Sequence, residues 1–229
     1  MNPSVHPFFH AATGSWSYVA TDPATRHAVV IDPVLDFDAK SARTGTALAD
    51  AILAHVHSGK LVVDWVLETH AHADHLSAGT YLAAELGAPL AIGAGITAVQ
   101  AHAARLYGFE SGFAADGSQF DRLWRDGDRV PLGSLEIEVI ATPGHTAGHM
   151  SLFVELQKGP PVLLCGDAAD LTENIEHEIA PGLCWRERED LALGSIRKLK
   201  TLGRETGASL WPNHDLAFWA GTMAASQWH

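Results

Sequence analysis

The sequence is poor in cysteine, in basic residues and in long apolar runs. Its two cysteines, Cys165 and Cys184, are too few for a disulfide framework in 229 residues, and we predict reduced, unpaired thiols in a cytoplasmic protein. Fifteen Lys and Arg against 27 Asp and Glu give a formal charge of −12, which argues against nucleic acid as a partner because phosphate binding needs clustered cations. No run of about 18 uncharged apolar residues occurs, and the N-terminus lacks the pattern of a secretory signal, so we expect no membrane partner. These absences favour an enzyme or binding protein for a small molecule, and they leave a homodimer open.

The hydrophobic content of 47% is enough for a sizeable core, and the pattern of apolar residues alternates between strands and helices. Strands are predicted over residues 15–20, 27–32, 61–68, 89–93, 135–142, 150–156, 161–167 and 208–215. Helices are predicted over 46–57, 78–88, 95–108 and 187–203, with Gly203 as the stop of the last one and a polar loop over 108–128. Because several strands follow one another directly, we predict an α/β fold of two mixed sheets with helices outside, in a single domain over 1–229.

Candidate metal ligands follow the ends of four predicted strands, in the motifs THAHADH, TPGHT, GDA and NHD. The seven candidates are His70, His72, Asp74, His75, His145, Asp167 and His214. Loops at the ends of neighbouring strands converge on a rigid sheet, so we expect these side chains to surround one site. Seven donors are too many for one tetrahedral ion, but they suit two adjacent divalent ions with a shared ligand, for which Asp167 is the candidate.

Such a donor set favours hydrolysis. Two adjacent ions lower the pKa of a bound water towards neutrality, and the resulting metal-bound hydroxide attacks a carbonyl carbon. Asp74 is the only acidic residue inside the first motif, where it could bind an ion, orient the hydroxide or move a proton. His149 is near enough to orient a ligand from outside the cluster. We therefore predict a catalytic role for Asp74 in addition to its role as a ligand.

These four motifs together resemble those of the metallo-β-lactamase superfamily, and the resemblance covers nearly the whole chain. It implies an αβ/βα sandwich of two mixed sheets with the metal site at one edge. For the two divalent ions we expect zinc, with iron as the alternative.

The part of the chain before about His145 resembles the persulfide dioxygenases, which are relatives of glyoxalase II. The resemblance rests on VIDPVLDFD, VLETHAHADHLSAGTYLAAELGAP and DGSQFDRLWRDGD. It implies a single iron held by His70, His145 and Asp167, and the oxidation of glutathione persulfide by oxygen.

The part after about His145 instead resembles the N-acyl homoserine lactonases, which are quorum-quenching enzymes. This resemblance rests on PGHTAGHMSLFVEL, GDAADLTENIEHEIAPG and the stretch that ends in PNHD. A change of resemblance near residues 148–156 fits either a natural intermediate subfamily or an engineered chimera. One position departs from the lactonase pattern: where those enzymes have a tyrosine three residues after the shared aspartate, this chain has Asp170.

Asp170 has two interpretations. Asp170 could protonate the leaving alkoxide or hinder lactone opening by its charge, or it could be the N-cap of a short helix that begins in DLTEN. For the whole chain, the sequence favours a hydrolase that opens a lactone or a related ester. The alternatives are a mononuclear iron persulfide dioxygenase, a thioesterase of the glyoxalase II kind, and a catalytically weak or silent chimera.

Overall fold

The computed structural model describes residues 3–109 and 112–224, which form three sheets. The first sheet has the order β1 (Ser4–His10), β2 (Ser15–Thr21), β3 (His27–Ile31), β6 (Val62–Glu68), β8 (Leu90–Gly93) and β9 (Arg122–Trp124). The second has the order β10 (Arg129–Leu132), β11 (Leu135–Ala141), β12 (Met150–Val154), β13 (Val162–Leu164) and β14 (Ser209–Trp211). A small third sheet joins β5 (Arg43–Gly45), β4 (Val34–Asp38) and β7 (Leu76–Ser77).

Both large sheets are mixed. In the first, β1, β2 and β3 pair antiparallel, and β3, β6, β8 and β9 pair parallel. In the second, only the β13–β14 pair is parallel. The helices are α1 (Ala47–Gly59), α2 (Gly79–Leu86), α3 (Ile96–Tyr107), α4 (Thr172–His177), α5 (Glu189–Thr206) and α6 (Leu216–Ala224), with 3₁₀ turns at Gly166–Ala168 and Trp185–Glu187. Among the helices of the described ranges, none has both the length and the apolar character needed to span a bilayer.

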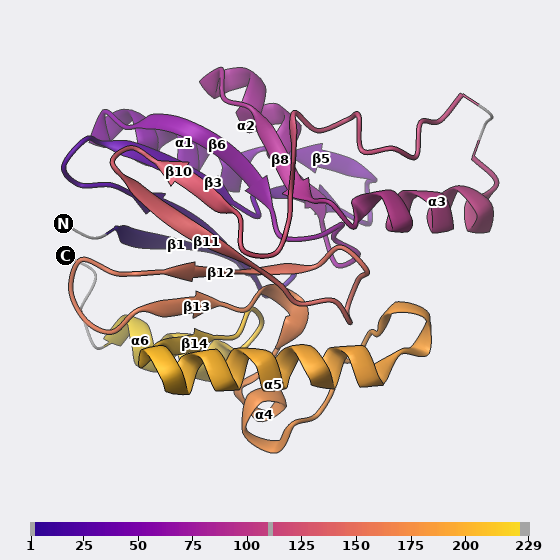
Figure 1. The fold of residues 1–229 in the computed structure, drawn as a ribbon. Coiled ribbons are helices and arrows are strands. Elements are labelled where there is room, and N and C mark those ends of the chain that lie inside the picture. Colours follow the sequence, from indigo (N-terminus) through magenta and orange to yellow (C-terminus); the bar gives the residue numbers. More distant parts are fainter. Residues whose placement is uncertain (1–2, 110–111, 225–229) are drawn as a thin grey trace.

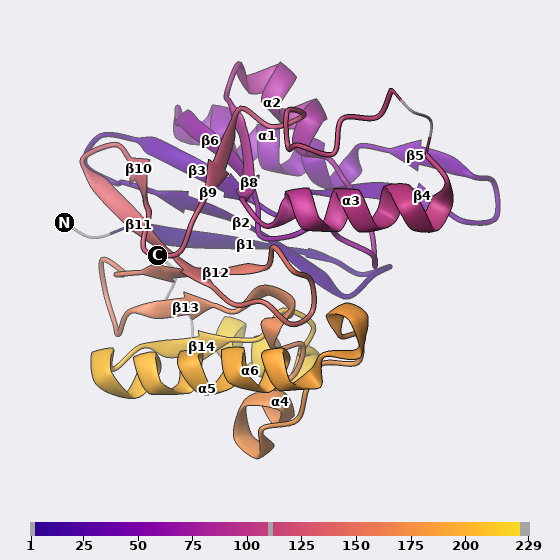
Figure 2. The ribbon, with the colours of Figure 1, turned by 45° about the vertical axis from the view of Figure 1, so that its right-hand side comes forward.

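The two large sheets pack face to face, and the helices lie outside them (Figure 1). The central core contains Tyr18 and Leu67 from the first sheet and Leu152 and Leu164 from the second. A second core lies between the first sheet and helices α1 and α2, and a third lies between the second sheet and α5. Figure 2 shows α1 and α2 on one side of the paired sheets and α4 and α5 on the other. The predicted sandwich of two mixed sheets is therefore confirmed.

The apolar spacing explains why these helices cover the sheets. On α1 the buried residues Ala49, Ile52 and Val56 recur every three or four positions, so one stripe faces the sheet. On α5 the same spacing relates Ala192, Ser195, Ile196, Leu199 and Gly203. In each case the opposite face meets solvent.

The predicted end of the last long helix is wrong. Helix α5 continues through Gly203 to Thr206, and Gly207 closes it in a left-handed conformation with φ 73°. Gly203 lies on the buried face, where a Cβ would come within 2.5 Å of the Leu210 side chain. Its absent side chain therefore serves packing and does not end the helix.

Several elements are absent from the sequence prediction. Strand β1 and the β4–β5 hairpin were not predicted, and β9 lies inside the stretch predicted as a loop over 108–128. All three are edge or peripheral elements with mixed burial, so the period of two is weak there.

Candidate metal centre

The candidate ligands lie on the loops that follow β6, β11, β13 and β14. His70, His72, Asp74 and His75 follow β6, and His145 follows β11. Asp167 lies in the 3₁₀ turn after β13, and His214 follows β14. The first sheet thus contributes four of the seven residues and the second sheet three, and the two sets meet at one edge of the sandwich.

Asp167 is the centre of the cluster. Its Oδ2 lies 3.5 Å from His70 Nε2 and 3.6 Å from His145 Nε2. Its Oδ1 lies 3.3 Å from His214 Nε2 and accepts a hydrogen bond of 3.0 Å from Asn213. The two oxygens of one buried carboxylate therefore face two different groups of histidines.

Asp74 lies on the other side of the cluster. Its Oδ1 is 4.0 Å from His72 Nδ1, and its Oδ2 is 3.9 Å from both His75 Nε2 and His214 Nε2. Its side chain is 28% exposed, whereas that of Asp167 is 4% exposed, so Asp74 borders the open side of the site.

The unpaired nitrogens of the cluster fit a metal centre. His70 Nε2, His72 Nδ1 and both ring nitrogens of His145 are buried without a hydrogen-bond partner. A buried polar atom without a partner is costly, and a metal ion would satisfy these atoms. Donor atoms of His70, His145 and Asp167 lie within 4.8 Å of one another, as do those of His70, His72 and Asp74 and those of Asp167, Asp170 and His214.

The other ring nitrogen of three of these histidines is held in place by one oxygen each, as is usual for metal-binding imidazoles. His70 Nδ1 is 3.0 Å from Thr69 Oγ1, and His75 Nδ1 is 2.9 Å from the carbonyl oxygen of Leu76. His214 Nδ1 is 3.2 Å from the carbonyl oxygen of Gly14. Each contact leaves the remaining nitrogen facing the cluster.

Two carboxylates hold His72. Its Nε2 is 3.1 Å from Asp32 Oδ1 and 3.0 Å from Glu68 Oε2, and all three side chains are almost fully buried. Burial alone would lower the pKa of His72, but the Asp32 and Glu68 carboxylates raise it well above its usual value. Glu68 is itself held by the Ser77 hydroxyl, and Asp32 by the amide and hydroxyl of Thr69. Asp32 and Glu68 were not predicted from the sequence.

Charge in the metal-free cluster is set by burial and by Asp167. Burial lowers the pKa of His70, and it lowers the pKa of His149 to about 4. Burial would also lower the pKa of His214, but the hydrogen bond and the charge of Asp167 raise it to about 9. His70 and His149 therefore favour the neutral imidazole, whereas His72 and His214, each beside a carboxylate, favour the charged form.

His149 lies just outside the cluster. Its ring centroid is 4.9 Å from that of His70, and its Nδ1 is 2.8 Å from Thr142 Oγ1. Thr142 is also 2.9 Å from Ser151 Oγ, which donates to the carbonyl oxygen of Cys165. Thr142 and Ser151 thus tie the loop that carries His145 to Cys165, two residues before Asp167, and His149 contacts Thr142.

The loop over residues 142–149 also meets the β8–α3 turn backbone to backbone. A Cβ on Gly95 would come within 2.6 Å of the Ala147 carbonyl oxygen and of Gly148 Cα. A Cβ on Gly93 would come within 2.4 Å of the Gly148 carbonyl oxygen. The absence of side chains at these glycines lets the two segments touch directly.

Asp170 lies beside Asp167 and His214, and it is not a helix cap. Leu171 is the N-cap residue of α4, and its amide donates to Asn174 Oδ1 at 2.8 Å, so the capping interpretation of Asp170 is wrong. Asp170 Oδ1 is buried without a hydrogen-bond partner. Burial, with a further contribution from the Asp167 charge, raises the pKa of Asp170 to about 6.

A hollow of about 310 Å³ adjoins the cluster. It is lined by His10, Thr13, Leu35, Phe37, His72, Ala73, Asp74, His75 and Leu76. Phe37 and Leu76 are about half exposed, so the hollow has an apolar part open to solvent in addition to the candidate ligands His72, Asp74 and His75. This is the arrangement expected of a binding site for a small, partly apolar molecule.

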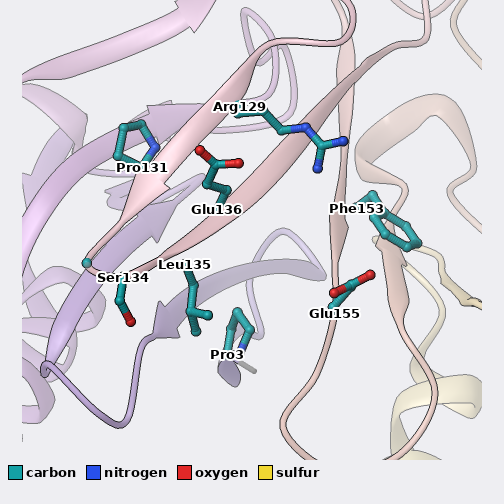
Figure 3. Close-up of a pocket in the computed structure, with 9 residues that line it drawn as sticks. Pro3, Arg129, Pro131, Ser134, Leu135, Glu136, Phe153 and Glu155 are labelled. Carbon is teal, nitrogen blue, oxygen red and sulfur yellow. The ribbon is translucent and has the colours of Figure 1, made fainter. Parts of the chain in front are cut away.

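Another hollow, of about 380 Å³, lies at the β10–β11 turn, far along both strands from His145. Figure 3 shows Arg129 and Glu136 on this hairpin, with Phe153 and Glu155 of the neighbouring segment across from them. None of the residues that line it is a candidate ligand.

Comparison with known proteins gives a consistent result. Residues 11–206 match the model of the metallo-beta-lactamase superfamily. The beta-lactamase hydrolase-like protein of Agrobacterium fabrum is 49% identical over 152 residues, which are 66% of this chain and only 35% of that protein. The N-acyl homoserine lactonase AttM of Rhizobium johnstonii is 28% identical over 243 residues, covering 98% of this chain and 84% of that one. A solved N-acyl homoserine lactone hydrolase with bound N-hexanoyl-L-homoserine shares the fold, with a TM-score of 0.65, 17% identity, and coverage of 96% of this chain and 95% of that one.

Proposed function

The chain belongs to the metallo-beta-lactamase superfamily, and from this we propose that it is a metal-dependent hydrolase that opens a lactone or a related ester. The observation that carries the proposal is the position of Asp167, whose Oδ2 faces His70 and His145 while its Oδ1 faces His214. A carboxylate placed between two groups of imidazoles suits a ligand shared by two ions. The similarity to AttM over 98% of this chain favours a lactone as the substrate class.

The donor set divides into two groups around Asp167. We assign one ion to His70, His72 and His145 and the other to Asp74, His75 and His214, with Asp167 shared. Asp167 Oδ2 faces His70 and His145 while its Oδ1 faces His214, and Asp74 Oδ2 lies 3.9 Å from both His75 and His214. When bound, such ions polarise an ester carbonyl and make water a better nucleophile at neutral pH. Zinc suits the nitrogen and oxygen donors present here.

The chain's own residues would position the substrate and supply a proton. Leu35, Phe37 and Leu76 offer an apolar wall to the acyl part of an ester. Opening the ring breaks the bond between the carbonyl carbon and the ring oxygen, which then needs a proton. Asp170 Oδ1, buried, unpaired and beside His214, is the atom that would hold this proton.

Two substitutions of Asp170 test its role. Asp170→Asn keeps the shape but removes the acid, and it should lower kcat by 10²-fold or more if Asp170 donates the proton. Asp170→Tyr should instead raise lactone hydrolysis about tenfold or more, one to two kcal/mol of barrier, if the carboxylate merely hinders an oxyanion. Metal content should stay the same in both variants. Unchanged rates in both would remove Asp170 from the reaction.

A second candidate function is a mononuclear iron persulfide dioxygenase. It is favoured by the compact group His70, His145 and Asp167, which suits a single iron, and by the resemblance of the N-terminal part. Metal analysis of protein purified without added metal separates the two, with about two zinc ions per chain for the hydrolase and about one iron for the oxygenase. Lactone hydrolysis and oxygen uptake with glutathione persulfide should be measured on the same sample. Oxygen uptake without lactone turnover would refute the hydrolase.

A further inference from the structure

The turn between β1 and β2 contacts two residues of the candidate metal centre. Ser15, which is fully buried, donates from its hydroxyl to Asp74 Oδ2 at 2.8 Å. The carbonyl oxygen of Gly14 lies 3.2 Å from His214 Nδ1. Asp74 and His214 come from different sheets, so this turn is a point at which both are held by one short segment.

A line of hydrogen bonds connects this turn to the N-terminus of α1. Thr13 Oγ1 lies 2.7 Å from Ser15 Oγ, and His10 Nδ1 lies 2.8 Å from Thr13 Oγ1. His10 Nε2 faces Asp36 Oδ1 at 3.4 Å. The other oxygen of Asp36 accepts from the backbone amide of Leu48, in the first turn of α1, at 3.1 Å.

The direction of donation along this line follows from the number of protons. Ser15 has one hydroxyl proton and gives it to the Asp74 carboxylate, so it must accept from Thr13. Thr13 then has no proton left for His10, so His10 Nδ1 must be the donor to Thr13. His10 is therefore protonated at Nδ1, and its Nε2 lies 3.4 Å from Asp36 Oδ1.

We propose that the turn over residues 10–15 is the positioning element for Asp74 and His214, and that His10 anchors this turn through Asp36 to α1. The turn fixes one oxygen of Asp74 and leaves the other towards His72. It also fixes the ring of His214 so that Nε2 faces Asp167 and Asp74. His10, Thr13 and Ser15 are positioning residues, since none is among the candidate ligands. The inference rests on the proposed function only in taking the site to hold two ions.

The predicted consequence is selective. Asp74 and His214 belong to one ion position, whereas His70, His72 and His145 belong to the other. Loss of a group that orients metal ligands commonly weakens metal binding by about 10- to 100-fold. Disturbing the turn should therefore weaken the second ion by at least tenfold and leave the first unchanged.

Thr13→Val and Thr13→Ser form a matched pair for the test. Valine has the shape of threonine but no hydroxyl, whereas serine keeps the hydroxyl. Zinc binding to each variant and to the unmodified chain should be measured by competition with a chromophoric chelator. We expect Thr13→Ser to retain both ions and Thr13→Val to bind the second at least tenfold more weakly. The proposal would be overturned if the two variants bound zinc equally, whether each held two ions or only one. It would also be overturned if Thr13→Val lost both ions while its melting temperature stayed that of the unmodified chain.

A second measurement tests the line of hydrogen bonds without any metal or substrate. In long-range ¹H–¹⁵N spectra of the metal-free chain, with His10 assigned by a His10→Gln variant, His10 Nδ1 should carry a proton. An unprotonated Nδ1 would reverse the direction of donation and overturn the anchoring role of His10. Neither measurement uses lactone turnover, so failure of the proposed activity and failure of this proposal are distinguishable.

Discussion

Asp22 is expected to hold the two large sheets together at the end of the sandwich opposite the metal centre. Its carboxylate accepts from Ala24 N at 2.9 Å and Thr25 Oγ1 at 2.7 Å within its own turn. It also accepts from Ser134 N at 2.9 Å and Ser134 Oγ at 2.6 Å, in the turn between β10 and β11. Asp22→Ala removes all four bonds and leaves the Ser134 amide without its acceptor.

Asp38 provides a matched control. It makes the same local bonds, from Lys40 N at 2.9 Å and Ser41 Oγ at 2.7 Å, but it is exposed, and these bonds lie within its own turn. Asp22→Ala and Asp38→Ala thus differ in the two Ser134 bonds and in the burial of Asp22. At about 1.5 kcal/mol or more for each bond to a charged acceptor, Asp22→Ala should lose roughly 3 kcal/mol through Ser134.

Urea unfolding at pH 7 measures this loss as a shift in the transition midpoint at constant slope. Burial alone would raise the pKa of Asp22, but the hydrogen bonds from Ser134 and Thr25 hold it well below its usual value. A lowered pKa in the folded state gives stability that is present above the unfolded value, near 3.9, and is lost as pH falls below it. The difference between the unmodified chain and Asp22→Ala should therefore be full above about pH 5 and shrink towards pH 2. Equal midpoints for Asp22→Ala and Asp38→Ala would refute the inter-sheet role.

Three further predictions concern the metal centre, the thiols and the glycine contact. Asp167→Ala should lose ions from both positions because the shared carboxylate is gone, and elemental analysis that finds full metal content would contradict a shared ligand. Cys165 and Cys184 should form no disulfide, and a Cys165–Cys184 bridge in unreduced protein would contradict this. Because burial raises the pKa of Cys165 to about 12, a thiol reagent should label native protein at the half-buried Cys184 and reach Cys165 only on unfolding. Gly95→Ala should destabilise the chain by about 1–3 kcal/mol through its clash with Ala147 and Gly148. The control is Gly194→Ala, which lies in open space on α5 and should stabilise the chain by about 0.5–1 kcal/mol. Equal melting temperatures for Gly95→Ala and Gly194→Ala would show that the backbone around Gly95 adjusts readily.

The sequence located the candidate ligands because they follow strand ends, where neighbouring loops of a sheet converge whatever their exact conformation. The residues that hold them follow no such rule. Asp32 reaches both Thr69 and His72 from a left-handed backbone with φ 47°, which a strand pattern does not predict. The sequence predicts only a strand at Ser15, and its hydrogen-bond partner Asp74 lies 59 positions away in the chain. Gly203 was predicted to end the helix because its close packing against Leu210, where a side chain would clash, cannot be seen in the local sequence.

The glycine contact between the β8–α3 turn and the loop over 142–149 has a consequence for redesign. In this part of the site, specificity cannot be altered by exchanging side chains at the closest point of approach, because none are present and none fit. In a random library that varies Gly93, Gly95 or Gly148, most variants would displace the loop that carries His145. The hollow beside Asp74 is bordered by half-exposed side chains at Phe37 and Leu76, which can change size without moving a backbone. Directed evolution towards a new ester should therefore vary Phe37 and Leu76 and keep the three glycines constant.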